Sequence, residues 1–227
     1  MSYSYYEVYT NAQRAFSGLG FPYGADEDAA FIITWLEVCG LDGVNLLNSK
    51  INELDNSFNA SIDASNINLD FNCDNKSMLA IGPGLIDYLI SKLTNSESFS
   101  IILKNCNDPI FLVPLLYKYS KKNINSQLTN NKKEIIVSMT KEKISIQKKL
   151  ITNNLTEDFN LLIANKKLNH SSLDINLDTI RINEALSKGL NPNKRSWEKI
   201  SEIAFRTFVP ESEESRSKGA GGGDAND

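Results

Sequence analysis

The chain has 227 residues, with 24 Lys or Arg against 28 Asp or Glu, which gives a formal net charge of −4. Hydrophobic residues make up 41% of the sequence and aromatic residues 9%, a composition that supports a packed core and excludes an intrinsically disordered chain. No apolar run approaches the roughly 20 residues of a membrane-spanning helix, and the first ten residues lack the basic and apolar regions of a secretory signal, so we expect a cytoplasmic protein that does not bind a membrane.

Three helices are predicted at the amino-terminal end. Apolar residues recur at three- and four-residue spacing over residues 4–16, the pattern of an amphipathic helix. A second helix begins with three acidic residues at 26–28, where the helix dipole favours negative charge, and ends at Gly40. A short third helix over residues 43–54 completes a helical unit.

Two asparagine-rich segments, residues 56–75 and 123–131, are predicted to be solvated loops. Residues 78–93 are expected to form a helix in which Gly82-Pro83-Gly84 is a break or a first turn. The same motif is too short for a phosphate-binding loop and lacks the Lys-Ser/Thr that would follow one. We therefore expect no nucleotide cofactor there.

The middle of the chain is rich in strand-forming residues. The run at 110–119 fits a short helix started by Pro109, and also a buried strand. Four β-branched runs predict strands at 98–103, 134–138, 143–147 and 159–164. Thr140-Lys141-Glu142 would join the second and third of these as a hairpin.

A last strand is predicted at 179–183 and a last helix at 193–208. The side chains expected to face inward from this helix are Trp197, Ile200, Ile203 and Ala204.

Helices therefore come first, strands dominate the middle and a helix comes last. Such segregation favours an α+β fold over a doubly wound sheet, and the short connections favour antiparallel pairing. We expect one domain over 1–227, made of a helical unit at 1–55, an α/β core at 77–208 and a glycine-rich carboxyl-terminal segment at 209–227.

The cysteines and the histidine argue against two kinds of site. Cys39, Cys73 and Cys106 are odd in number and follow no secretory signal, so we expect no disulfide framework and treat their spacing as chance. Cys39 is expected to be a small core residue. His170 is the single histidine, so no Cys/His metal site is expected, and its polar surroundings predict a solvent-exposed side chain in preference to a catalytic base.

Charge is distributed unevenly along the chain. Residues 1–103 carry a net charge of −9, residues 104–150 carry +7 from lysines alone, and residues 151–227 carry −2. A nucleic-acid surface more often adds arginine and aromatic residues, so nucleic acid is not expected as a partner. The lysines are expected to guard exposed loops and edge strands, or to pair with the acidic part within the chain or between subunits.

The carboxyl-terminal segment holds the candidate site. Its Gly, Ser and acidic residues are typical of a flexible tail, but consecutive glycines can also direct backbone N–H groups toward an anion. Arginines, aided by Lys218, would bind a carboxylate or phosphate, serine hydroxyls would assist, and carboxylates would handle a proton or a hard cation. The predicted catalytic residues are Asp224 and Asp227, and the predicted binding residues are Arg206, Ser212, Ser215, Arg216, Gly219 and Gly221.

Both ends of the chain resemble an uncharacterised proteobacterial family of about this length, a domain of unknown function. The residues that carry this resemblance are G-F-P-Y-G-A-D-E-D-A at 20–29, G-L-D-G at 40–43, R-T-F-V-P-E-S-E-E-S-R at 206–216 and the closing G-A-G-G-G-D-A-N-D. Members of that family carry Tyr at the position of Phe208. The resemblance implies no activity, but it implies that the terminal segment is a family feature.

Leu41-Asp42-Gly43-Val44, after a glycine-containing turn and an acidic helix start, also resembles the opening of the type-2 malate/lactate dehydrogenases. That family continues with Ser-His-Gly, whose histidine is catalytic. Here Asn45-Leu46-Leu47 stands at that place, so we do not expect NAD-dependent dehydrogenation.

We expect a small-molecule metabolic enzyme, or an accessory subunit of one, that binds a small anionic metabolite through its carboxyl-terminal segment. The alternative is a non-catalytic assembly subunit that forms a homo-oligomer or joins a partner enzyme through its charged surfaces. The sequence contains no G-x-S-x-G nucleophile motif and leaves open whether the protein is catalytic.

Overall fold

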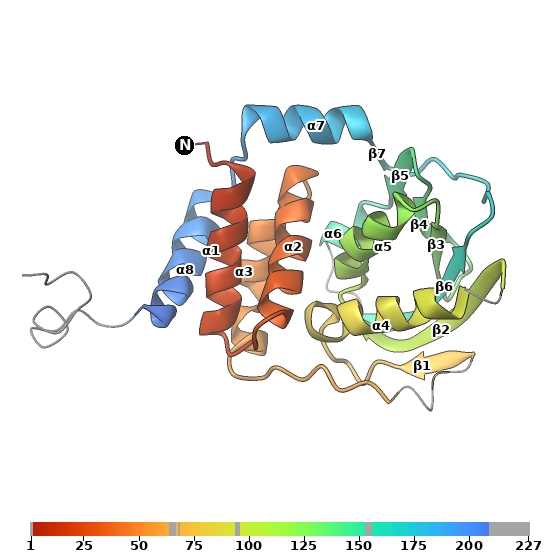
Figure 1. Cartoon of the computed structure of the whole chain (residues 1–227), viewed down its shortest axis with the longest axis horizontal. Helices are drawn as coiled ribbons and strands as arrows, with labels where there is room; N and C mark the ends of the chain where they lie inside the picture. The colour runs from red at the N-terminus through yellow and green to blue at the C-terminus, as the bar shows by residue number, and fades with distance from the viewer. Residues whose placement is uncertain (1, 64–66, 68, 94–95, 153–155, 209–227) are drawn as a thin grey trace, which may run out of the picture.

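The computed structural model describes residues 2–63, 67, 69–93, 96–152 and 156–208. A helical unit lies beside a sheet whose one face is covered by two helices (Figure 1). The helical unit consists of α1 (Tyr5–Gly18), α2 (Ala25–Val38), α3 (Gly43–Leu54) and α8 (Lys194–Ala204). The three amino-terminal helices and the last helix are confirmed.

Side chains near the helix starts satisfy the backbone N–H groups that have no partner within the helix. At α1, Ser4 Oγ accepts a hydrogen bond from Glu7 N at 3.2 Å, and Glu7 Oε2 accepts one from Ser4 N at 2.7 Å. At α2, the buried Asp26 accepts from Gly24 N and Glu27 N. One of the acidic residues at the start of α2 therefore stabilises this helix by binding backbone N–H groups of its first turn.

Helix α8 returns to pack against α1 and α3, although it follows them by 140 residues or more. Ile200, Ile203 and Ala204 are buried, as predicted, and Trp197 is half-buried against the ring of Tyr3 at 4.2 Å. This packing makes the last helix part of the amino-terminal unit.

Within the described residues the sheet has seven strands in the order β1-β2-β6-β3-β4-β5-β7. The pair β1–β2 is parallel and the other pairs are antiparallel, which confirms the mostly antiparallel α+β prediction. In chain order the strands are β1 (Asp70–Asn72), β2 (Ser98–Asn107), β3 (Asn125–Asn130), β4 (Ile135–Met139), β5 (Lys143–Ile146), β6 (Thr156–Ala164) and β7 (Ile175–Asp178). The predicted hairpin joins β4 to β5.

Both segments predicted as loops contain a strand. β3 runs in the centre of the sheet, where Ser126, Leu128 and Asn130 are buried between β4 and β6. β1 is an edge strand inside the 56–75 segment. Asparagine disfavours strands, but pairing on both sides of β3 overrides that preference.

The predicted strand at 179–183 is wrong, because those residues begin α7 (Thr179–Lys188). Asp178 caps this helix by accepting a hydrogen bond from Arg181 N at 2.9 Å. The last strand, β7, lies immediately before the cap. Helix α7 then crosses from the sheet to the helical unit (Figure 1).

Helices α4 (Met78–Lys92) and α5 (Leu112–Ser120) cover the inner face of the sheet. α5 follows a short 3-10 turn, η3 (Pro109–Phe111), so the helical alternative for 110–119 is confirmed. Pro83 lies inside α4, so Gly82-Pro83-Gly84 neither breaks nor starts that helix. The remaining short elements are α6 (Lys149–Thr152) and η4 (Phe205–Thr207).

Candidate functional site

Of the predicted site residues, Arg206 lies in the described part of the chain, on η4 at the end of α8. Its Nη1 atom donates to Asp55 Oδ1 at 2.8 Å and Oδ2 at 2.9 Å, and lies 3.4 Å from the carbonyl oxygen of Gly18. Arg206 thus ties α8 to the ends of α3 and α1, and would have to exchange Asp55 for a ligand to bind an anion. The other predicted residues lie outside the described residues: Ser212, Ser215, Arg216, Gly219, Gly221, Asp224 and Asp227.

A second arginine lies where the described chain ends. The guanidinium of Arg14 lies over the ring of Phe208, with Cζ 5.0 Å from the ring centroid. Among the described residues it forms no ion pair with a carboxylate. Arg14 was not among the predicted site residues, although it is the single arginine in the strongly acidic stretch 1–103.

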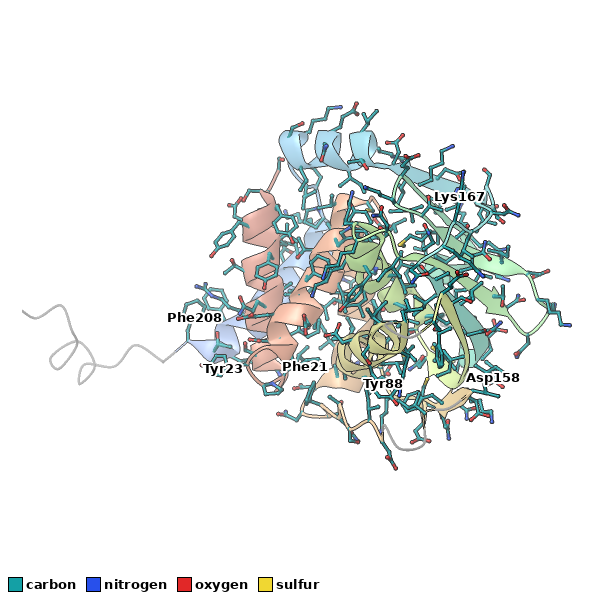
Figure 2. All side chains as sticks on the ribbon, turned by 45° about the vertical axis from the view of Figure 1, so that its right-hand side comes forward. Phe21, Tyr23, Tyr88, Asp158, Lys167 and Phe208 are labelled. Carbon is teal, nitrogen blue, oxygen red and sulfur yellow. The ribbon has the colours of Figure 1, made fainter. Side chains whose placement is uncertain are left out.

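Exposed aromatic rings lie at the same end of the helical unit as this arginine (Figure 2). Phe205 and Phe208 are 68% and 49% exposed with ring centroids 5.3 Å apart, and Tyr23 is 97% exposed. Figure 2 shows Phe208 and Tyr23 at the same end of the helical unit. We call the set of Arg14, Tyr23, Phe205, Arg206 and Phe208 the Arg14–Phe208 surface.

A groove of about 590 Å³ runs along α8 and ends at this surface. Tyr3 and Trp197 line it at one end and Phe205 at the other, and Glu198 and Glu202 on its wall are paired with lysines of the same helix. Its volume is in the range of small-molecule sites.

The sheet face turned away from α4 and α5 carries polar side chains along one cross-strand row. Loop residues 165–174 lie over part of this face, where Gln127 Nε2 donates to Asn169 O at 2.7 Å and Asn125 Nδ2 donates to Lys166 O at 2.9 Å. In register from β2 to β7, the row is Ser100, Leu162, Gln127, Ser138, Ser145 and Asn176, and its one apolar member is Leu162. His170, which lies on this loop, is hydrogen-bonded to two serines of the row.

His170 is half-buried, which corrects the expectation of an exposed side chain. The Ser145 hydroxyl donates its proton to Asn176 Oδ1, so His170 Nε2, 2.9 Å away, must donate to Ser145 Oγ. His170 Nδ1 is then an acceptor 3.5 Å from Ser138 Oγ, which itself accepts from Ser171 N at 3.1 Å. The hydrogen bonds therefore specify the neutral Nε2–H tautomer and occupy both ring nitrogens, which leaves His170 a structural role.

We expect the pKa of His170 to lie below its ordinary value, because burial and the charge of Lys143 both disfavour the imidazolium. An NMR titration of its ring protons in the native protein, compared with the urea-unfolded chain, measures this difference. Since the native pKa is the lower one, the stabilising contribution of His170 is present above the unfolded pKa and is lost as the pH falls. A native pKa equal to or above the unfolded value would contradict this account.

The junction between the helical unit and the sheet contains a buried ion pair. Lys50 Nζ on α3 lies 2.7 Å from Asp108 Oδ2 and 3.0 Å from Glu53 Oε2, and the side chains of Lys50 and Asp108 are 7% and 5% exposed. Burial opposes the charge of Lys50, but hydrogen bonds to Asp108 and Glu53 outweigh it and raise the pKa of Lys50. Burial also raises the pKa of Asp108 against the opposing effect of Lys50.

A third polar contact lies between α4 and α5. Tyr119 donates a hydrogen bond to Asp87, and burial together with this bond raises the pKa of Tyr119 to about 12. Tyr119 is therefore protonated at neutral pH. Within the described ranges no three His, Cys, Asp or Glu side chains are grouped to hold a metal ion, and none of the described helices has the length and apolar character to cross a bilayer.

A known family matches the amino-terminal part of the chain. Residues 3–76 match the model of a family described as a protein of unknown function (DUF3726). The expected resemblance to a domain of unknown function is thereby confirmed for the part that contains residues 20–29 and 40–43. No curated protein matches the chain.

Solved structures that share the fold include two dehydrogenases. Sulfolactate dehydrogenase from Methanocaldococcus jannaschii superposes with a TM-score of 0.59 at 9% identity, over 89% of this chain and 96% of that one. Malate dehydrogenase from Pyrococcus horikoshii OT3 superposes with a TM-score of 0.58 at 10% identity, over 93% and 97%. The protein therefore has the fold of these metabolic enzymes.

Asn45-Leu46-Leu47, at the position where the type-2 dehydrogenases carry Ser-His-Gly, helps to pack α3 in this protein. Asn45 Oδ1 accepts a hydrogen bond from Ser196 Oγ at 2.8 Å, which joins α3 to α8, and Leu47 is fully buried. His170 lies elsewhere, on the loop between β6 and β7. The shared fold does not bring a histidine to α3.

Proposed function

We propose that this protein is a cytoplasmic metabolic enzyme, or an accessory subunit of one, and that it binds a small anionic metabolite at the Arg14–Phe208 surface. The observation that carries the proposal is the guanidinium of Arg14, which lies on Phe208 without a described carboxylate partner. Phe208 is also the residue after which the predicted anion-binding segment begins.

Arg14 suits this role chemically. A guanidinium can give two parallel hydrogen bonds to a carboxylate or phosphate, and stacking on an aromatic ring holds its plane in a defined orientation. The groove along α8 offers apolar volume for the rest of the ligand. The sequence prediction supplies the rest of the anion site, which consists of Ser212, Ser215, Arg216 and the N–H groups of Gly219 and Gly221. In this proposal Asp224 or Asp227 accepts or donates a proton.

The fold supports the chemical class of the ligand. The two structural neighbours are named for sulfolactate and malate, small organic acids that are anions at neutral pH. We therefore propose a hydroxy acid, or a related acid with one or two anionic groups, as the ligand class.

Isothermal titration calorimetry of the full chain with malate and sulfolactate tests the proposal. We expect Arg14→Gln to weaken binding about tenfold or more, because a charge-assisted hydrogen bond is lost, and deletion of 209–227 to abolish it. Arg195→Gln, an exposed arginine at the other end of α8, is the control and should bind as the wild type does. Equal affinity in all four proteins would refute the proposed site.

The alternative, an assembly subunit, is favoured by the exposed Tyr23, Phe205 and Phe208 beside arginine, because these residue types are enriched in protein interfaces. Analytical ultracentrifugation of the wild type and of Phe205→Ser separates the two functions. A metabolite-binding surface leaves the sedimentation coefficient unchanged, whereas an assembly surface loses an oligomer in the variant.

A further inference from the structure

Cys73 and Cys106 lie together in the core, although 33 residues separate them in the sequence. Both are free and completely buried, and the neighbouring Cys73 side chain is a cause of the raised pKa of Cys106. Strand pairing, and not a sequence repeat, therefore places these two thiols near each other.

The pairing of β1 with β2 explains this contact. The ladder runs from Asp70↔Ile102 to Asn72↔Lys104, and Cys73 N continues it with a 2.8 Å hydrogen bond to Lys104 O. Phe71 is buried two residues earlier, so Cys73 lies on the same inner face of the strand.

A bulge in β2 brings Cys106 to the same face. Leu103 pairs with Phe159 but Cys106 pairs with Glu157, so β2 holds one extra residue, and Asn105 has a positive φ of 49°. Without the extra residue, strand alternation would place Asn105 on the same buried face as Ile101 and Leu103. With it, Cys106 faces inward and Asn105 is exposed.

We propose that Cys73 and Cys106 are a modification site at which a peroxide forms a reversible intramolecular disulfide. The Cys73 sulfur attacks one oxygen of hydrogen peroxide, the O–O bond breaks, and the cysteine becomes a sulfenic acid as water leaves. The Cys106 sulfur then attacks the Cys73 sulfur, the S–S bond forms, the S–O bond breaks, and a second water leaves. Two thiols lose two electrons and two protons in total, and one peroxide becomes two water molecules.

Local opening of β1 gives the oxidant access. β1 has three residues and lies at the edge of the sheet, so it separates from β2 more easily than a central strand does. In the closed state the neighbouring Cys73 side chain and burial raise the pKa of Cys106, and burial shields both cysteines from the oxidant. Oxidation is therefore limited by the opening of β1.

The proposed disulfide would lie next to the junction between the sheet and the helical unit. Asn107, adjacent to Cys106, donates to Glu53 Oε1 of α3 at 3.0 Å, and Asp108 holds Lys50. A disulfide would join β1 covalently to the strand that makes these contacts. Because it closes a long loop, it would restrict the unfolded chain and raise thermal stability.

The test treats the reduced full chain with hydrogen peroxide, alkylates the remaining thiols, and maps disulfide peptides by mass spectrometry. We expect a single bond between Cys73 and Cys106, an alkylated Cys39, a melting temperature raised by roughly 6–10 °C, and full reversal by dithiothreitol.

Two variants complete the test. Cys39→Ala retains the pair and should show the same bond and the same shift, whereas Cys73→Ala should show neither. A bond that includes Cys39, disulfide-linked dimers, or oxidation that stops at single sulfinic acids on Cys73 or Cys106 would overturn the proposal.

Discussion

Replacing Gly43 by alanine is expected to lower the free energy of unfolding by about 3 kcal/mol or more. Gly43 is the first residue of α3, where this helix crosses α2. A Cβ atom there would lie 2.1 Å from Ile33 O and 2.8 Å from Glu37 N. These are backbone atoms inside α2, so no side chain can rotate away and the two helices must separate. Urea unfolding followed by far-UV circular dichroism measures the loss.

Gly84→Ala is the matched control. Gly84 lies inside α4, and a Cβ there would make an ordinary contact of 3.4 Å with the end of the Ile62 side chain. Alanine is the better helix former, so we expect a gain of roughly 0.5 kcal/mol. Similar losses in Gly43→Ala and Gly84→Ala would show that the crossing of α2 and α3 is not the cause.

Lys50→Met is expected to cost about 3 kcal/mol, because it leaves the carboxylate of Asp108 buried without its cation. Methionine retains most of the apolar stem, so the loss reports mainly on charge. Lys104→Met is the control: Lys104 lies at the same 2.7 Å from Asp70, but both side chains are about half exposed. An exposed pair contributes less than about 1 kcal/mol.

The pH dependence of the Lys50→Met variant separates charge from packing. Burial already raises the pKa of Asp108, and removing Lys50 removes the group that opposes this shift. An acid with a raised folded pKa is most favourable to folding below its unfolded pKa, and stability is lost as the pH rises through the folded pKa. The difference between wild type and variant should therefore shrink on acidification, and a difference independent of pH would point to packing instead.

The buried pair also suggests how the two units hold their relative position. Lys50 and Glu53 come from α3, whereas Asp108 and Asn107 follow the bulge of β2. A ligand at the Arg14–Phe208 surface would contact the same helical unit, because Arg206 is bonded to Asp55 directly after α3. The helical unit therefore connects the proposed ligand surface with the buried ion pair at the junction.

Local signals predicted the helical elements well. The apolar spacing of α1 and α8, the acidic first turn of α2 and the start of α3 at Gly43 are properties of short stretches of chain. The same kind of signal placed the β4–β5 hairpin, because its strands are adjacent in sequence.

Contacts between distant residues decided the rest. β3 is a strand because β4 and β6 flank it, despite its asparagines. Residues 179–183 are helical for a local reason that the residue pattern did not reveal, which is the cap at Asp178. Arg14 meets Phe208, and Cys73 meets Cys106, because packing brings together residues far apart in the chain. Composition and periodicity record which face of an element is buried, but they contain no information about which other element covers it. The sequence by itself therefore determined most of the helices and the β4–β5 hairpin, whereas the tertiary structure decided β3 and the partners of each element.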